Sequence, residues 1–264
     1  MPNAAHFHHD LALLDWHLEL GADEAIGEAP INRYNLEAAA PKPVAQPKVA
    51  PQPAAPITPS PKVFDSTPIA QACTSLEALR AAMEGFDHCA LKQGARNTVF
   101  CDGHPSARVM IIGEAPGREE DRAGKPFIGR AGQLLDKMFA AIGLSRHEEA
   151  AESALYITNL LPWRPPQNRD PLPEETTLMK PFLLRHIELA QPDFIITMGN
   201  ASTKTLRDTT QGITKMRGQW GEVLGLPSIP LFHPAYLLRS PEKKREAWAD
   251  LLSLKARLEG QANG

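Results

Sequence analysis

Four short apolar runs separated by helical patterns constrain the fold of this chain more than any other feature. They are ARVMII at 107–112, LYIT at 155–158, DFIITM at 193–198 and IPLF at 229–232. Apolar runs of this length are typical of strands that are buried on both faces. Strands that alternate with helices pair in parallel and are covered by helices on both sides. The sequence therefore predicts an α/β fold, a three-layer α/β/α sandwich with a four-stranded parallel central sheet.

Helical spacing of apolar side chains marks the segments between and after these runs. GQLLDKMFAAIG at 132–143 places its apolar residues on one face and ends at a glycine, and residues 173–190 form a second helical pattern. Ser240 is placed to cap a last helix that begins at Pro241. The predicted buried side of that last helix consists of Trp248, Leu251, Leu252 and Leu258.

Three regions of different composition divide the chain. Residues 39–70 alternate proline with alanine, valine and lysine, a composition that cannot bury a core and that predicts a disordered linker. Before it, residues 1–38 carry apolar side chains at helical spacing, which predicts an N-terminal helical segment. After it, residues 71–260 contain all four apolar runs, so the catalytic or binding domain is expected there.

Composition excludes several classes of protein. The three cysteines, Cys73, Cys89 and Cys101, are too few for a disulfide framework and match no zinc spacing. No apolar stretch approaches the roughly 18 to 20 residues that span a bilayer, and the N-terminus lacks a signal-peptide core, so we expect a cytoplasmic protein without a membrane partner. Residues 1–71 carry 4 basic and 8 acidic side chains of the total 28 and 31, so the remainder is nearly neutral. Contact with nucleic acid must then come from local basic patches.

The segments that directly follow the four runs should carry the chemistry, because ligands of parallel sheets bind beyond the carboxyl ends of the strands. These segments read GEAPGREEDRAGKPF, NLLPWRPPQNRDP, GNASTK and HPAYLLRSPEKKR. Neither the phosphate-binding pattern G-x-x-x-x-G-K-S/T nor the dinucleotide pattern G-x-G-x-x-G is present. The first segment holds four acids within eight residues, which is compatible with a two-carboxylate hydrolase site or with a solvated turn.

Taken together, the four segments resemble the uracil-DNA glycosylase superfamily, specifically its family 4, the branch usually built with an iron-sulfur cluster. The resemblance covers about residues 86–250 and rests on three motifs in order: GEAPG-x-x-E-D-x-x-G-x-P-F-x-G-x-A-G-x-L-L, N-x-x-x-x-R-P-P-x-N-R and H-P-A-Y-L-L-R. It implies a monofunctional uracil-DNA glycosylase that flips deoxyuridine out of DNA and hydrolyses its N-glycosidic bond. An abasic site would remain, as in base excision repair.

The resemblance also implies a role for individual residues around the flipped base. Phe127 would stack on the uracil ring, and the side-chain amide of Asn159 would pair with uracil N3 and O4. His233 would donate a hydrogen bond to uracil O2, where negative charge develops as the bond breaks. Gly113 and Ala115 complete the expected uracil-binding set, and the related first family has an aspartate in place of Ala115.

A carboxylate is expected to position the attacking water and to stabilise the cationic sugar. Glu114 is the first choice, with Glu120 and Asp121 as alternatives. No lysine is evidently placed to form a Schiff base, so simple hydrolysis is expected.

The segment after the fourth run is expected to hold the DNA. Leu237 matches the leucine that related enzymes insert into the duplex, and Leu238 competes for this role. A basic cluster follows and is suited to the flanking phosphates. Its members in our prediction are Arg239, Lys243, Lys244 and Arg245.

Family 4 proteins typically bind a [4Fe-4S] cluster through four cysteines. Alignment on Cys89 places Phe86, Cys89, Trp163 and Met179 at these four positions. One thiolate cannot hold such a cluster, so we predict that no cofactor and no metal is bound. The three replacements are expected to pack together near Cys89 and to fill the volume of the cluster.

Two other functions remain open from the sequence. One is a noncatalytic DNA- or nucleotide-binding module on the same fold, and the other is a small-molecule hydrolase that uses the acidic turn. For the favoured glycosylase, the expected partner is uracil-containing DNA and the expected state is a monomer.

Overall fold

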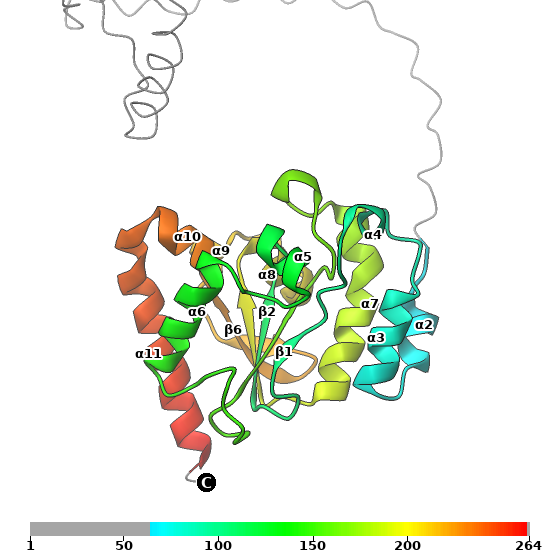
Figure 1. Cartoon of the computed structure of the whole chain (residues 1–264). Coiled ribbons are helices and arrows are strands. Elements are labelled where there is room, and N and C mark those ends of the chain that lie inside the picture. Colours follow the sequence, from blue (N-terminus) through cyan, green and yellow to red (C-terminus); the bar gives the residue numbers. More distant parts are fainter. Residues whose placement is uncertain (1–63, 263–264) are drawn as a thin grey trace, which may run out of the picture. The chain divides into compact units, whose positions relative to one another are not determined.

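The computed structural model describes residues 64–262, and its centre is a six-stranded sheet in the order β1-β3-β2-β4-β6-β5 (Figure 1). Adjacent pairs among β2, β3, β4 and β6 run parallel, whereas β1 and β5 pair antiparallel at the two edges. The strand bounds are β1 Asp102–Gly103, β2 Val109–Gly113, β3 Leu155–Asn159, β4 Phe194–Met198, β5 Gly221–Val223 and β6 Leu226–Leu231. The four predicted strands are therefore confirmed. The edge strands were not predicted, because two or three residues without an apolar run carry no strand pattern.

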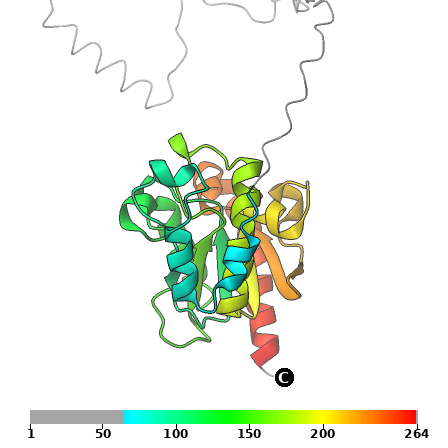
Figure 2. The ribbon, with the colours of Figure 1, turned by 90° about the vertical axis from the view of Figure 1, so that its right-hand side faces the viewer.

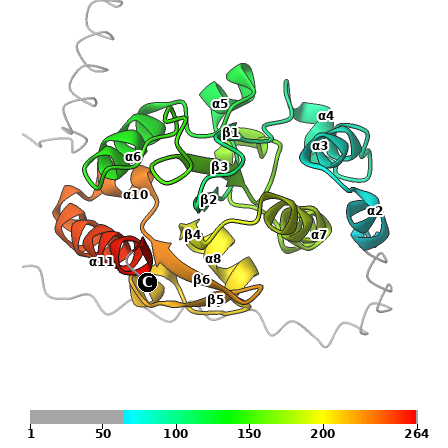
Figure 3. The same cartoon turned by 90° about the horizontal axis from the view of Figure 1, so that it is seen from below.

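Helices cover both faces of the sheet, which confirms the three-layer sandwich (Figure 3). One layer contains α6 (Arg130–Ala140) and α11 (Lys244–Ala262). The other contains α2 (Thr67–Ala72), α3 (Leu76–Glu84) and α7 (Pro173–Ala190), which lie in front of the sheet in Figure 2. Shorter helical elements occupy the connections: α4 Leu91–Gly94, α5 Arg118–Ala123, η2 Pro166–Asn168, α8 Asn200–Arg207, α9 Ile213–Met216, α10 Pro234–Arg239 and η3 Pro241–Lys243.

Side chains of the central strand β2 alternate between two hydrophobic cores. Val109 and Ile111 pack in the core that includes α6 and α11, whereas Met110 and Ile112 pack in the core that includes α3 and α7. All four are completely buried, as the period of two in a strand requires for a sheet covered on both faces. Burial of each such side chain contributes about 1.5–3 kcal/mol. The continuous apolar character of the run thus follows from the three layers.

The described fold begins before residue 71, where we had expected the linker to end. Ser66 is buried and its hydroxyl donates to the carbonyl of Leu178 in α7 at 2.6 Å, and Ala70 is also buried. The last residues of the predicted linker therefore belong to the folded part. The predicted N-terminal helical segment 1–38 and most of the linker lie outside the described residues.

The final helix buries only part of the face predicted for it: Leu251 is buried and Leu258 packs against the same core, but Trp248 and Leu252 do not. Trp248 and Leu252 are 43% and 45% exposed, whereas Ala247, Leu251 and Leu254 are buried. Neighbouring positions on a helix differ by about 100° around its axis, so a stripe through Ala247 and Leu251 turns Trp248 toward solvent. No helix in residues 64–262 is both long enough and apolar enough to cross a bilayer.

The strand order determines where a ligand can bind. The chain passes from β2 to β3 on one side and later returns to β4 on the other side of β2. In an open α/β sheet, such a reversal of direction opens a crevice beyond the carboxyl ends of the two strands on either side. Here those ends are Gly113 of β2 and Met198 of β4.

Candidate active site

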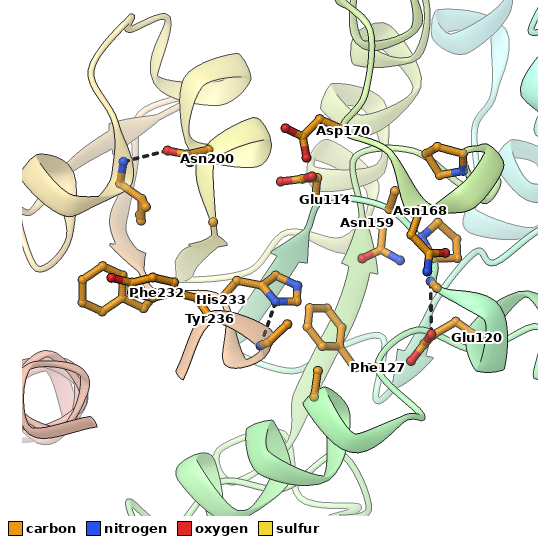
Figure 4. Close-up of a pocket in the computed structure, with 18 of the residues that line it drawn as sticks. Glu114, Glu120, Phe127, Asn159, Asn168, Asp170, Asn200, Phe232, His233 and Tyr236 are labelled. Atoms are coloured by element: carbon orange, nitrogen blue, oxygen red, sulfur yellow. Dashed lines mark hydrogen bonds between the residues drawn. The ribbon is translucent and has the colours of Figure 1, made fainter. Parts of the chain in front are cut away.

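A pocket of about 560 Å³ lies at the carboxyl ends of the parallel strands. Glu114 follows β2, Asn159 ends β3, Asn200 begins the helix after β4, and His233 follows β6 (Figure 4). All four strand-end segments therefore meet in one cavity, although they are far apart in the chain.

Phe127 and Asn159 are brought together by the glycine at the end of β2. Gly113 pairs with Asn159 across the two strands. A Cβ atom at Gly113 would lie 2.3 Å from Oδ1 of Asn159 and 2.6 Å from Cε2 of Phe127. Only glycine fits at this position without displacing both side chains. The ring of Phe127 also faces that of His233, with the ring centroids 5.3 Å apart and the planes at 26° (Figure 4).

The Asn159 amide is a buried polar group that lines the pocket. The residue is only 6% exposed. No described residue forms a hydrogen bond with its side chain. Fully buried polar side-chain atoms in the described residues all have partners, so the unpaired amide atoms of Asn159 must be accessible, and the pocket that this residue lines is where they are accessible. A primary amide offers a donor and an acceptor side by side, which suits a planar ligand edge with the reverse pattern.

His233 is a neutral donor aimed at the same cavity. Its removal from solvent lowers its pKa to about 4, and the positive charge of Arg239 acts in the same direction while Glu120 opposes it. Nδ1 of His233 accepts a hydrogen bond from the main-chain N–H of Ala235 at 3.1 Å. Because Nδ1 accepts, the single proton of the neutral ring lies on Nε2, which is then available to donate to a ligand.

Glu114 provides a carboxylate at the edge of the pocket. Burial raises the pKa of Glu114, and the negative charge of Asp170 raises it further. The N–H of Ala201 in α8 has the opposite effect, because it donates a hydrogen bond of 3.4 Å to the carboxylate. Figure 4 shows the carboxylates of Glu114 and Asp170 beside each other. Asp170 was not among the predicted site residues, although it lies in the segment that follows the second apolar run.

The other two predicted carboxylates lie in different surroundings. Glu120 lines the pocket, but its oxygens accept the main-chain N–H groups of Gly117, Ile128 and Gly129 at 3.1, 2.8 and 2.9 Å. Asp121 does not line the pocket, because the next position on α5 points about 100° away. Its Oδ1 accepts from the main-chain N–H of Arg96 at 2.8 Å. The expectation that Asp121 lies in the site is therefore wrong, and Glu120 is committed to the backbone.

Comparison with known proteins gives the family. Residues 100–252, more than half of the chain, match the Uracil DNA glycosylase superfamily. This chain belongs to that superfamily. The Type-4 uracil-DNA glycosylase of Thermotoga maritima is 39% identical over 172 residues, which cover 64% of this chain and 86% of that protein.

Two further relatives are similar over comparable shares of this chain. The Type-4 uracil-DNA glycosylase of Sulfurisphaera tokodaii is 37% identical over 180 residues, 65% of this chain and 79% of that protein. A DNA polymerase of Bacillus phage SP01 is 35% identical over 159 residues, 60% of this chain but 17% of that protein. The region of that polymerase that is similar to this chain is thus a small part of a longer protein.

The leucine that was expected to insert into DNA is not exposed in the structure. Leu237 is 1% exposed and packs with Phe232 and Ala247, so the expectation that it projects from the surface is wrong. Helix α10 begins at Pro234 and its turn directs Leu237 inward. Leu238, the other candidate, is 36% exposed.

The predicted phosphate-binding side chains divide into two groups. Arg239 is exposed and lines the pocket at the carboxyl ends of the strands, and Lys244 is exposed at the start of α11. Lys243 instead donates to Glu246 at 2.7 Å, so part of its charge is compensated within the protein.

The residues at the iron-sulfur positions of the superfamily's type-4 branch do not fit a cluster. Phe86, Cys89, Trp163 and Met179 belong to one hydrophobic core and are at most 3% exposed. Phe86 packs edge-on against Phe182, with ring centroids 5.0 Å apart. Only one of the four positions carries a thiol, and no group of three histidine, cysteine, aspartate or glutamate side chains in residues 64–262 could hold a metal ion.

Proposed function

We propose that this protein is a monofunctional uracil-DNA glycosylase that excises uracil from DNA by hydrolysis and leaves an abasic site. The observation that carries the proposal is the meeting of Phe127, Asn159 and His233 in one pocket. The names of the type-4 relatives support the same substrate.

Recognition of uracil in this proposal depends on an aromatic face and an amide. Phe127 provides a surface on which a flipped pyrimidine stacks. The Asn159 amide then donates to uracil O4 and accepts from N3–H, whereas cytosine presents the opposite pattern at these two atoms. The absence of a competing partner for this amide among the described residues supports the assignment.

Cleavage of the glycosidic bond moves electrons into the uracil ring, and negative charge accumulates on O2. A donor placed at that oxygen lowers the barrier by roughly 3–4 kcal/mol in comparable oxyanion sites. His233 is suited to this task because its ring is neutral and carries the proton on Nε2. A neutral donor also avoids a full positive charge in the free pocket.

The sugar gains positive charge as uracil departs, and water must attack it. Glu114 can hold that water and stabilise the cation, because its carboxylate lines the pocket and is not bonded to an arginine or lysine in the described part of the chain. Among the described residues that line the pocket, none is a lysine, which supports hydrolysis without a Schiff base.

The duplex in this proposal lies across the pocket mouth, with Leu238 filling the space of the flipped nucleotide and Arg239 and Lys244 near the phosphates. The exposure of Leu238 and the position of Arg239 at the mouth support this orientation. In this proposal no cofactor takes part, because Phe86, Trp163 and Met179 occupy three of the four positions of the cluster ligands.

The proposal is tested with a labelled oligonucleotide that contains one deoxyuridine. We expect strand scission only after alkali, because hydrolysis leaves an abasic site that alkali cleaves. Asn159→Ala and His233→Ala should each lower single-turnover excision by about 10²-fold or more. Scission without alkali would contradict the monofunctional mechanism. Retained DNA binding with no excision by the wild-type protein would favour a noncatalytic module.

A further inference from the structure

The backbone at the stacking residue Phe127 is in a conformation that needs support. Its φ angle is 53°, in the left-handed region that is unfavourable for residues with a large side chain. Helix α6 packs directly against it, since a Cβ atom at Gly132 would lie 1.7 Å from the Phe127 carbonyl oxygen. A conformation of this kind persists only where surrounding contacts determine it.

Arg146 supplies these contacts on the carbonyl side of the turn. It is not a pocket residue, and its side chain is 3% exposed. Nη1 donates to the carbonyl of Pro126 at 2.9 Å and Nη2 donates to the carbonyl of Phe127 at 3.0 Å. The planar guanidinium thus holds two consecutive carbonyl groups at once.

Two carboxylates hold the Arg146 side chain in turn. Nε donates to Asp136 of α6 at 2.8 Å, and Nη1 also contacts Asp102 of β1 at 3.1 Å. The buried positive charge is therefore compensated, and all three guanidinium nitrogens are bonded. On the opposite side of the turn, Glu120 accepts the N–H groups of Ile128 and Gly129. The turn is held by its carbonyl groups from one side and by its amides from the other.

We propose that Arg146 is a positioning residue that holds the Phe127 ring in the orientation and position in the pocket at which a flipped uracil stacks on it. This inference rests on the proposed function, because it assigns the turn to a base. Arg146 does not line the pocket and its side chain is 3% exposed, so in this inference its effect on the base passes through Phe127. A residue that only joined α6 to the sheet would instead affect every property of the protein equally.

Binding to two DNA duplexes separates these roles. One contains 2′-fluoro-2′-deoxyuridine, whose fluorine disfavours the cationic sugar and so leaves the base attached; the other contains a tetrahydrofuran residue that has no base. We expect Arg146→Lys in the full chain to bind the fluorinated duplex about 10-fold more weakly than wild type, because lysine lacks the planar fork. Binding to the tetrahydrofuran duplex should change less than about 2-fold, because Phe127 has no base to contact.

A matched control and a double variant complete the experiment. Arg108 forms an ion pair with Asp193 at 2.6 Å near the opposite ends of the strands, and Arg108→Lys should leave both affinities within about 2-fold. In a Phe127→Ala background, Arg146→Lys should weaken binding of the fluorinated duplex no further. Arg146→Met serves as a more severe variant, and the lysine variant decides the question if Arg146→Met does not fold.

The outcomes of this experiment distinguish the inference from the proposed function. The inference would be overturned if Arg146→Lys kept the wild-type ratio of affinities for the fluorinated and the tetrahydrofuran duplex, whether both affinities were unchanged or both fell equally. An additional loss in the Phe127→Ala background would also overturn it. Absence of uracil excision and of any base preference in the wild-type protein would overturn the proposed function together with the inference.

Discussion

The main-chain N–H of Ala235 donates to Nδ1 of His233, and the proton of the neutral imidazole therefore lies on Nε2. The first turn of α10 thus determines which ring nitrogen faces the pocket. Proline at the preceding position begins the helix and has no N–H of its own, so Ala235 is among the first residues able to donate.

Replacement of His233 should therefore lower the rate of the chemical step and leave DNA affinity nearly unchanged. We expect His233→Ala and His233→Gln to lower kcat by about 10²–10³-fold, as removal of an oxyanion donor does elsewhere. Because the pKa is about 4, no activity loss from His233 protonation is expected between pH 5.5 and 8. Single-turnover rates measured across that range test the rate and its pH dependence, and binding to the duplex with 2′-fluoro-2′-deoxyuridine tests the affinity. An acid limb near pH 6.5 that disappears in His233→Gln would contradict them.

The charge of Asp170 near Glu114 predicts how excision activity depends on pH. Glu114 must be ionised to hold water and stabilise the cation, so activity should fall as pH drops through its raised pKa. The Asp170 charge contributes to that rise, so Asp170→Asn should move the acid limb to lower pH. Glu114→Gln should lower kcat by about 10²-fold or more. Rates of the three proteins between pH 4 and 8 provide the measurement, and an unmoved acid limb in Asp170→Asn would count against the pairing.

Two neighbouring leucines should have opposite phenotypes. Leu237→Ala removes a buried side chain and should lower the free energy of unfolding by about 2–4 kcal/mol. Leu238→Ala should leave stability within about 0.5 kcal/mol. It should nevertheless reduce excision from duplex DNA more than from single strands, where no stack needs to be filled. Urea unfolding and excision from both substrates check the pair. A duplex defect that tracks Leu237 and not Leu238 would contradict the assignment.

The hydrophobic residues at the cluster positions predict a protein without iron. Purified protein should be colourless and should contain iron far below one cluster per chain. Cys89→Ser should then leave excision within about 3-fold of wild type, because the thiol is buried and holds no metal. Elemental analysis and a visible absorption spectrum make the measurement. Stoichiometric iron would overturn this prediction.

Buried His186 should make folding stability depend on pH. Tyr156 and His186 share a hydrogen bond of 2.8 Å, and burial lowers the His186 pKa to about 3. The unfolded chain therefore binds a proton at this side chain below about pH 6.5 while the folded chain does not. Stability should fall as pH decreases from 6.5 toward 4. In His186→Gln, the urea midpoint should depend less on pH over this interval, and an unchanged slope would contradict the assignment.

Much of this protein follows from local sequence patterns. The parallel strands could be predicted as continuous apolar runs, because both faces of each strand are buried, as Met110 and Ile111 show. The position of Glu114, Asn159 and His233 directly after strands predicts their common location, because parallel strands end at the same edge of the sheet. Topology thus predicts that these segments share one edge of the sheet, whereas the role of each residue was predicted from the resemblance to the superfamily.

Other features depend on contacts that no local pattern encodes. Asp121 and Glu120 are adjacent acids, and only the packing of α5 decides that one faces the 96–97 loop and the other the Phe127 turn. Leu237 and Leu238 differ in exposure for the same reason, since the axial rotation of α10 against Phe232 and Ala247 decides which leucine is buried. Arg146 shows no motif of its own. Its role emerges only where the Phe127 carbonyl, Asp102 and Asp136 converge on one guanidinium, because a hydrogen-bond network depends on distances in space between residues that are remote in the chain.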